Sequence, residues 1–208
     1  MRFLDLGLED PVPDATTIWL FREALVEGGV IDQLFARFGQ HLAAAGYIAR
    51  GGPIIDATIV SVPKQRNTKE ENDAIKGGQT PEGWENEPAK NAQKDKDARW
   101  TKKNDESFYG YKNHIGVDKA HKLIRTWEAT DAAVHDSQKL DDLLDLSNTS
   151  REVWADSAYR SEAIERRLTE QGLHSRIHRG GVRNRPLSQC QKATNTIRSK
   201  VRARVERR

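Results

Sequence analysis

Two short apolar segments each contain one aspartate, and they constrain the fold more than any other feature of the sequence. PIIDATIVSVP at 53–63 is a β-branched run bounded by prolines, which predicts a buried strand, and EVWADSAY at 152–159 predicts another. Burial of an isolated carboxylate costs several kcal/mol unless it is paired, hydrogen-bonded or bound to a metal. Asp56 and Asp156 are therefore either satisfied structural aspartates or ligands.

The hydrophobic periodicity around these strands predicts helices and a β-hairpin. The expected elements are two amphipathic helices before Gly46, a hairpin from 108–118 and 123–132, helices at 137–146 and 161–172, a short strand at 174–178 and a helix at 189–207. This order predicts an α/β fold, a mixed sheet flanked by helices. A helical N-terminal segment, 1–50, precedes a core that covers 51–208.

The segment 64–107 differs in composition from its surroundings. Its 44 residues include ten basic and ten acidic side chains, several glycines and prolines, and few apolar residues. Such a segment buries too little apolar surface to order itself, so we interpret it as a mobile, charged insertion in the core. The alternative is a loop that becomes ordered on a ligand.

Charge is distributed unevenly along the chain. Residues 1–50 have a net charge of −3, whereas residues 174–208 contain eleven basic residues and one acidic residue, a net charge of +10. A basic end favours a polyanionic partner, and nucleic acid is the commonest one in a cytoplasm. A solvated basic helix is the alternative interpretation.

Three further features limit the classes of protein. The single cysteine, Cys190, excludes a disulfide framework and a cysteine-only zinc site. No run of about 18 apolar residues is present, which argues against a membrane partner. The first residues lack the basic and apolar pattern of a signal peptide, so we expect a cytoplasmic protein.

A third carboxylate, Glu206, lies among arginines in the predicted terminal helix. It either pairs with Arg202 one helical turn earlier or joins Asp56 and Asp156. Three carboxylates suit Mg²⁺, and two such ions about 3.5–4 Å apart can activate the attacking oxygen and stabilise the leaving oxygen of a phosphodiester. His114, in the second strand, either faces such a site or is a hydrogen-bonded strand histidine.

Several motifs together resemble a known family. In order they are PDATTIWLFREAL, IIDATIVSVP, YGYKNHIGVD, the pair His135-Asp136, ADSAYRS and SKVRARVE, spanning about residues 13–206. In this order they resemble the signatures of DDE transposases of bacterial insertion sequences, specifically the insertion-sequence-five type. The resemblance implies an RNase H-like core in which Asp56, Asp156 and Glu206 are the catalytic and metal-binding residues.

The resemblance also implies a reaction and its partners. We expect Mg²⁺-dependent or Mn²⁺-dependent hydrolysis at the terminal inverted repeats of an element, followed by attack of the freed 3′-hydroxyl on target DNA. Double-stranded DNA, as element ends and target, is the expected partner, bound by a homo-oligomer that in bacteria associates with the nucleoid. The basic residues expected to contact this DNA are Arg198, Lys200, Arg202 and Arg204.

The chain also departs from the family pattern. Ser199 replaces a tyrosine that related transposases carry three residues before the arginine, and helical segments that members carry before PDATT and after the glutamate are missing. From this we expect a chain truncated at both ends and incomplete at the C-terminal side of its core. The alternative function is a catalytically inactive, DNA-binding remnant of a transposase, and a structure-selective nuclease is a third possibility.

Overall fold

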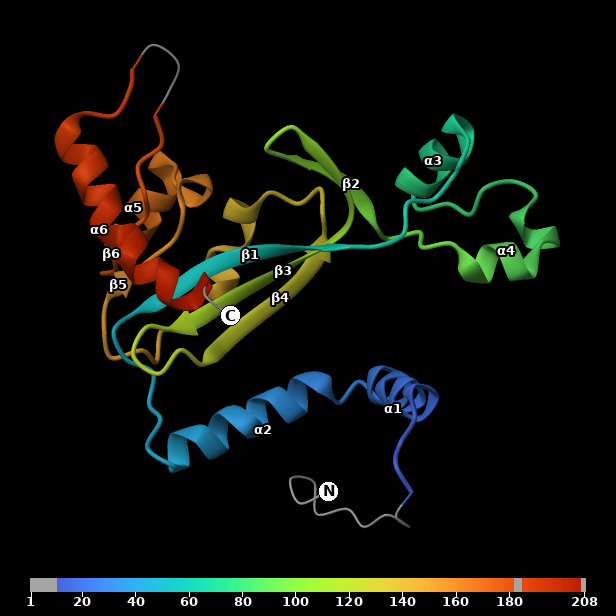
Figure 1. Ribbon diagram of the computed structural model, residues 1–208, viewed down its shortest axis with the longest axis horizontal. Helices are drawn as coiled ribbons and strands as arrows, with labels where there is room; N and C mark the ends of the chain where they lie inside the picture. The colour runs from blue at the N-terminus through green and yellow to red at the C-terminus, as the bar shows by residue number, and fades with distance from the viewer. Residues whose placement is uncertain (1–10, 182–184, 207–208) are drawn as a thin grey trace. The chain divides into compact units, whose positions relative to one another are not determined.

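The computed structural model describes residues 11–181 and 185–206, with the side chains of 204–206 outside the description (Figure 1). Contacts divide the chain into two compact units, Met1–Ile48 and Ala49–Arg208. No helix in the described ranges is long and apolar enough to cross a membrane.

The first unit contains two helices, α1 (Ala15–Glu27) and α2 (Ile31–Ala44), as the periodicity predicts. Asp14 caps α1, because its carboxylate accepts a hydrogen bond from Thr17 N at 2.7 Å. The helix therefore begins directly after this aspartate.

The second unit contains a mixed sheet. Its strands are β1 (Pro53–Ser61), β2 (Arg99–Lys103), β3 (Glu106–Asp118), β4 (Ile124–Asp131), β5 (Glu152–Val153) and β6 (His174–Ser175). β3 pairs antiparallel with β1, β2 and β4, whereas β5 and β6 are parallel. A parallel bridge between Ile54 and Trp154 joins the two groups. The pairings give the order β4, β3, β1, β5, β6, with β2 as a further partner of β3.

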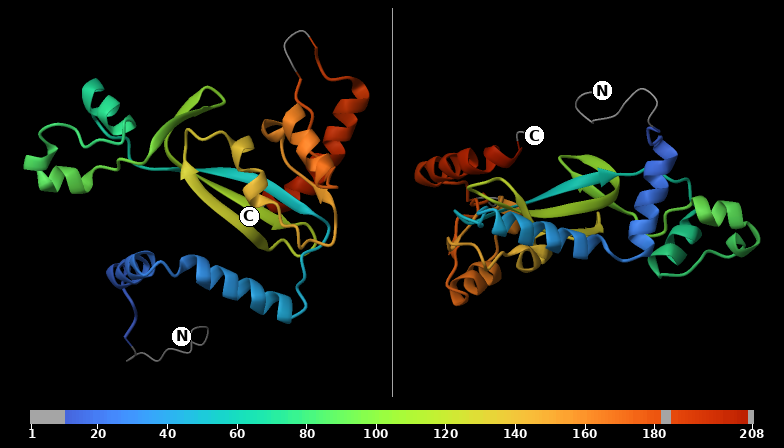
Figure 2. Two further views of the ribbon diagram at one scale, coloured as in Figure 1. Left: turned by 180° about the vertical axis from the view of Figure 1, so that it is seen from behind. Right: turned by 90° about the horizontal axis from the view of Figure 1, so that it is seen from below.

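Helices flank this sheet, which confirms the predicted fold class. Figure 2 shows α6 (Gln189–Glu206, red) on one side of the sheet and α5 (Glu162–Glu170, orange) on the other. Ser161 caps α5, since its hydroxyl accepts from Ile164 N at 3.2 Å. The main core is formed by buried residues of β1, β5, α5 and the segments beside them: Ile55, Leu140, Leu143, Val153, Ala155, Tyr159, Ile164, Leu168, Leu173 and Ile177.

The segment 136–143 differs from the helix expected at 137–146. It forms two short 3-10 helices, η2 (Asp136–Lys139) and η3 (Asp141–Leu143). Leu140 and Leu143 are both fully buried, and a spacing of three residues places them on one side of a 3-10 turn. Burial of this pair outweighs the local preference for a longer α-helix.

The charged segment 64–107 has more local structure than its composition indicates. It contains α3 (Lys69–Lys76), η1 (Trp84–Asn86), α4 (Pro88–Gln93) and strand β2. A capping box between Thr68 and Glu71 begins α3, and Trp84 is 1% exposed with its indole N–H donating to Glu71 at 2.7 Å. Figure 1 shows α3 and α4 beyond the end of the sheet opposite α5 and α6. Mobility of this segment stays a prediction.

Candidate active site

β1 brings Asp56 to the boundary between core and solvent. Ile54 and Ile55 are 1% and 0% exposed, whereas the side chain of Asp56, the next residue, is 28% exposed. Asp56 lies opposite Ile115 in the antiparallel pair with β3. Consecutive strand residues face opposite sides, so both faces of β1 are covered as far as Ile55, and the strand becomes partly exposed at Asp56.

β5 and the turn after it position Asp156. Asp156 caps the short helix η4 (Ser157–Tyr159), and its Oδ1 accepts a hydrogen bond from Ala158 N at 2.8 Å. This bond uses part of the acceptor capacity of the carboxylate and leaves the rest available. A side chain fixed to its own backbone in this way keeps its direction without a tertiary partner.

The parallel pairing of β1 with β5 places the two aspartates at matching positions. Ile55 N donates to Trp154 O at 2.8 Å, and Trp154 N donates to Pro53 O at 2.9 Å. Asp56 and Asp156 each follow the bridged residues Ile54 and Trp154 by two positions. Since paired backbone segments lie about 4.8 Å apart, this bridge brings the segments that carry the two aspartates, a hundred residues apart in sequence, to one place.

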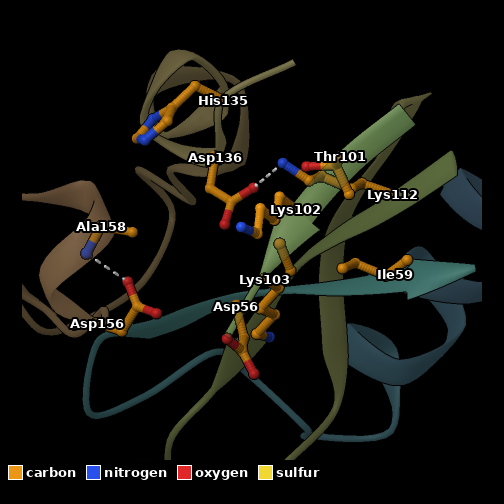
Figure 3. A pocket seen from close by; sticks show the side chains of 11 residues that line it. Asp56, Ile59, Thr101, Lys102, Lys103, Lys112, His135, Asp136, Asp156 and Ala158 are labelled. Atoms are coloured by element: carbon orange, nitrogen blue, oxygen red, sulfur yellow. Dashed lines mark hydrogen bonds and ion pairs between the residues drawn. The ribbon is translucent and has the colours of Figure 1, made fainter. Parts of the chain in front are cut away.

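Both aspartates line a pocket of about 240 Å³, here called the carboxylate pocket (Figure 3). It is lined by Asp56, Ala57, Ile59, Thr101, Lys102, Lys103, Lys112, His135, Asp136, Asp156 and Ala158. An adjoining pocket of about 390 Å³ shares Asp56, Asp156 and Lys103 and adds Arg202. The two aspartates expected from the sequence therefore line one cavity, Asp56 from strand β1 and Asp156 from the turn after β5.

Arg202 joins α6 to this cavity. Its Nη2 lies 3.3 Å from Asp56 Oδ1, and only 11% of its side chain is exposed. The contact spans 146 residues of sequence, so it fixes the C-terminal helix against the first strand. A guanidinium at this position offsets the negative charge of the aspartate and points further N–H donors into the same region.

A second ion pair lies in the carboxylate pocket. Lys112 Nζ lies 2.8 Å from Asp136 and donates to Val134 O at 2.7 Å, and its side chain is 11% exposed. This pair was not predicted. The strand that contains Lys112 has several other polar residues, so its sequence gives no local signal for a buried lysine.

His135 has the capping role expected of a turn residue, since its ring nitrogen accepts from Ser137 N at 3.3 Å. His114 is fully buried in β3, with Nε2 2.9 Å from the Thr130 hydroxyl, and burial lowers its pKa. Of the two alternatives for His114, the structure shows the hydrogen-bonded strand histidine. His114 does not line the carboxylate pocket.

The four predicted DNA contacts on α6 occupy different surroundings. The Arg198 guanidinium donates to Ile177 O, and burial together with nearby arginines lowers its pKa. Lys200 is exposed, and Arg202 faces Asp56. The side chain of Arg204 lies outside the described part of the structure.

The donor chemistry of the pocket suits a hard divalent cation. Asp56 and Asp156 supply carboxylate oxygens, the ligands that Mg²⁺ and Mn²⁺ prefer. Glu206 ends α6, but its side chain is not among those described, so the expected third ligand is not tested. Among the described side chains, no group of three His, Cys, Asp or Glu residues is close enough to hold a metal by itself.

The comparisons with known proteins agree with this architecture. The family model of the transposase DDE domain matches residues 50–208, which is more than half of the chain and includes Asp56, Asp156 and Arg202. The mixed sheet flanked by helices is consistent with the RNase H-like fold of such domains. No solved structure matches the chain.

Proposed function

The chain belongs to the family of transposase DDE domains, and from this we propose that it cuts DNA at the terminal inverted repeats of an insertion sequence of the insertion-sequence-five type and joins the freed 3′ ends to target DNA. One observation carries the proposal. Asp56 lies in β1, and Asp156 lies just after the segment that pairs parallel with β1, each two positions beyond the bridged residues Ile54 and Trp154, and both aspartates line one pocket. A phosphodiester placed there would meet two preorganised oxygen ligands.

Divalent metal ions are general cofactors of this family, and Mg²⁺ or Mn²⁺ is the ion we propose here. Asp56, Asp156 and Glu206 would hold it. When bound, such ions supply Lewis-acid stabilisation of the attacking and leaving oxygens of the phosphodiester.

Two contacts within the chain orient the aspartates, and one of them also offsets negative charge. Ala158 N fixes one oxygen of Asp156, and Arg202 fixes one oxygen of Asp56, so both carboxylates keep their direction before substrate arrives. Preorganised groups of this kind need no rearrangement as charge develops on the transferring phosphate. Arg202, which pairs with Asp56, can also contact the phosphate itself.

We propose Arg198, Lys200, Arg202 and Arg204 as the DNA-binding residues of α6, and element ends and target as the DNA. The position of α6 supports this proposal, because its residue Arg202 lines the pocket that adjoins the carboxylate pocket. Joining two ends to one target requires both ends in one complex, so we propose a homo-oligomer on DNA. We place it in a bacterial cytoplasm, associated with the nucleoid when bound.

Cleavage of a labelled duplex carrying the DNA that flanks this gene tests the proposal. We expect cleavage in Mg²⁺ or Mn²⁺ by the unsubstituted chain, and loss of at least about a hundredfold in rate in Asp56→Asn and in Asp156→Asn, because displacement of a ligand by about 1 Å already costs that much. Asp73→Asn is the control, since Asp73 is 60% exposed on α3. Thermal melting checks that each variant is folded.

The outcomes separate the candidate functions. Cleavage that survives in both pocket variants would refute the assignment of the pocket. Salt-sensitive binding without any cleavage by the unsubstituted chain would indicate the alternative, an inactive DNA-binding remnant. Cleavage that ignores the end sequence would indicate a structure-selective nuclease.

A further inference from the structure

The β2–β3 hairpin reaches the carboxylate pocket from the charged segment. β2 and β3 pair in register from Arg99 opposite Gly110 to Lys103 opposite Glu106. The two residues between the strands, Asn104 and Asp105, have φ of +50° and +66°, which is the left-handed backbone of a tight two-residue turn. A tight turn with an intact register fixes the positions of the residues next to it.

Two lysines at the end of this hairpin line the carboxylate pocket. Lys102 and Lys103 share the cavity wall with Asp56 and Asp156, and Lys103 also lines the adjoining pocket that contains Arg202. Figure 3 shows both lysine side chains among the carboxylates of the pocket. The carboxylate pocket and the adjoining pocket therefore together have basic groups from two separate elements, the hairpin and α6.

The ammonium groups of these two lysines have weak partners or none in the described residues, unlike the third lysine of the pocket. Lys112 is engaged by Asp136 and by a backbone carbonyl. Lys102 pairs at 3.1 Å with Asp105, whose side chain is 97% exposed, and a pair so exposed contributes at most about 1 kcal/mol. Lys103 is exposed and makes no ion pair or hydrogen bond within the described part of the chain.

We infer that Lys102 and Lys103 bind the backbone phosphates of the DNA strand that enters the carboxylate pocket, on the hairpin side and in addition to the contact made by Arg202. The inference rests on the proposed function, which supplies DNA as the substrate. It adds a second basic element to the one on α6.

The chemistry of the pocket favours a phosphate ligand. A phosphodiester beside Asp56 and Asp156 is attracted by the cations around it, and Lys102 and Lys103 add positive charge to that of Arg202. Lysine provides a flexible point charge that suits phosphate oxygens without any requirement on base sequence. Contacts from two separate elements, the hairpin and α6, would fix the direction of the strand as well as its distance from the aspartates.

Salt dependence of binding measures this role. Removal of one lysine–phosphate interaction with duplex DNA reduces the slope of log K against log salt by about 0.9, so the double variant Lys102→Gln/Lys103→Gln should reduce it by about 2. Binding of the labelled flanking duplex by anisotropy, at several salt concentrations, gives the slope. Cleavage of the same duplex gives the rate.

Lys76→Gln is a matched control. Lys76 is 68% exposed and pairs with Asp73 three residues away, whereas Lys102 is 64% exposed and pairs with Asp105 three residues away. The two lysines have similar exposure and pairing, but Lys76 does not line the carboxylate pocket. We expect its salt slope and cleavage rate to stay within error of the unsubstituted chain.

Three results would overturn the inference. An unchanged slope in the double variant, with binding and cleavage by the unsubstituted chain intact, refutes the hairpin contact and leaves the proposed function standing. If Lys76→Gln reduces the slope as much as each hairpin lysine does, the effect is common to surface lysines, and the inference is refuted. Absence of any DNA binding by the unsubstituted chain refutes the proposed function and the hairpin contact together.

Discussion

Gly52→Ala should damage the packing that holds the two aspartates together. Gly52 directly precedes β1 and has φ of +87°, a backbone conformation that residues with a Cβ rarely adopt. A Cβ at this position would lie 2.0 Å from the carbonyl oxygen of Glu152 in β5. Real Cβ atoms essentially never lie within 3.0 Å of a non-bonded atom from another segment, so one of the two backbone segments must move.

The magnitude follows from two contributions. A left-handed backbone costs an alanine about 1–2 kcal/mol. Forcing two packed backbone segments apart adds about 1–3 kcal/mol, the usual cost of overpacking. The sum, about 2–5 kcal/mol, is a large part of the 5–15 kcal/mol by which domains are typically stable.

Urea denaturation followed by tryptophan fluorescence measures this loss, and Gly172→Ala separates its two parts. Gly172 has φ of +68° with nothing within 4 Å of an added Cβ, so only the backbone cost applies there. We expect Gly52→Ala to lose at least about 1 kcal/mol more than Gly172→Ala. Equal losses in the two variants would show that β1 and β5 are not packed as closely as the structure indicates.

Two further predictions concern buried polar groups. Burial lowers the pKa of His114, so below about pH 6.5 the unfolded chain binds a proton that the folded chain does not, and the free energy of unfolding should fall as pH decreases from 7 to 5. His114→Gln should flatten this dependence, and an identical pH profile in both proteins would contradict it. The Tyr159 hydroxyl is buried without a hydrogen-bond partner among the described residues, and burial raises its pKa, so Tyr159→Phe should leave stability unchanged or raise it by up to about 1 kcal/mol. A loss of more than about 1 kcal/mol in urea denaturation would show that the hydroxyl has a partner.

Strand β1, the hairpin of β3 and β4 and the two aspartates were predictable because each has a local signal. The strand expected at 152–159 is wrong in extent, because only Glu152–Val153 forms a strand and Asp156 caps the short helix η4, and β2 was not predicted. A β-branched run between prolines predicts β1, and its single carboxylate stands out against apolar neighbours. The hairpin of β3 and β4 follows in the same way from alternation and turn residues. These features depend on residues within about ten positions of one another, which sequence patterns capture.

The pairing of distant segments was not predictable in the same way. The bridge between Ile54 and Trp154 decides that the aspartates meet, and nothing in either segment specifies that register. Trp84 is buried through a contact with Glu71 inside a segment whose composition indicates little structure. The ion pair of Lys112 with Asp136 is likewise a tertiary contact between two elements, so residue composition alone could not identify it.

Binding of Mn²⁺ in the absence of DNA tests most directly whether Asp56 and Asp156 form one site. Electron paramagnetic resonance of free Mn²⁺ gives the affinity of the unsubstituted chain, of Asp56→Asn, of Asp156→Asn and of the control Asp73→Asn. We predict saturable binding that weakens at least about tenfold in each pocket variant and stays unchanged in the control, since loss of even an outer partner of a metal ligand typically costs 10–100-fold. Equal affinity in the unsubstituted chain and both pocket variants would contradict a shared carboxylate site between β1 and β5.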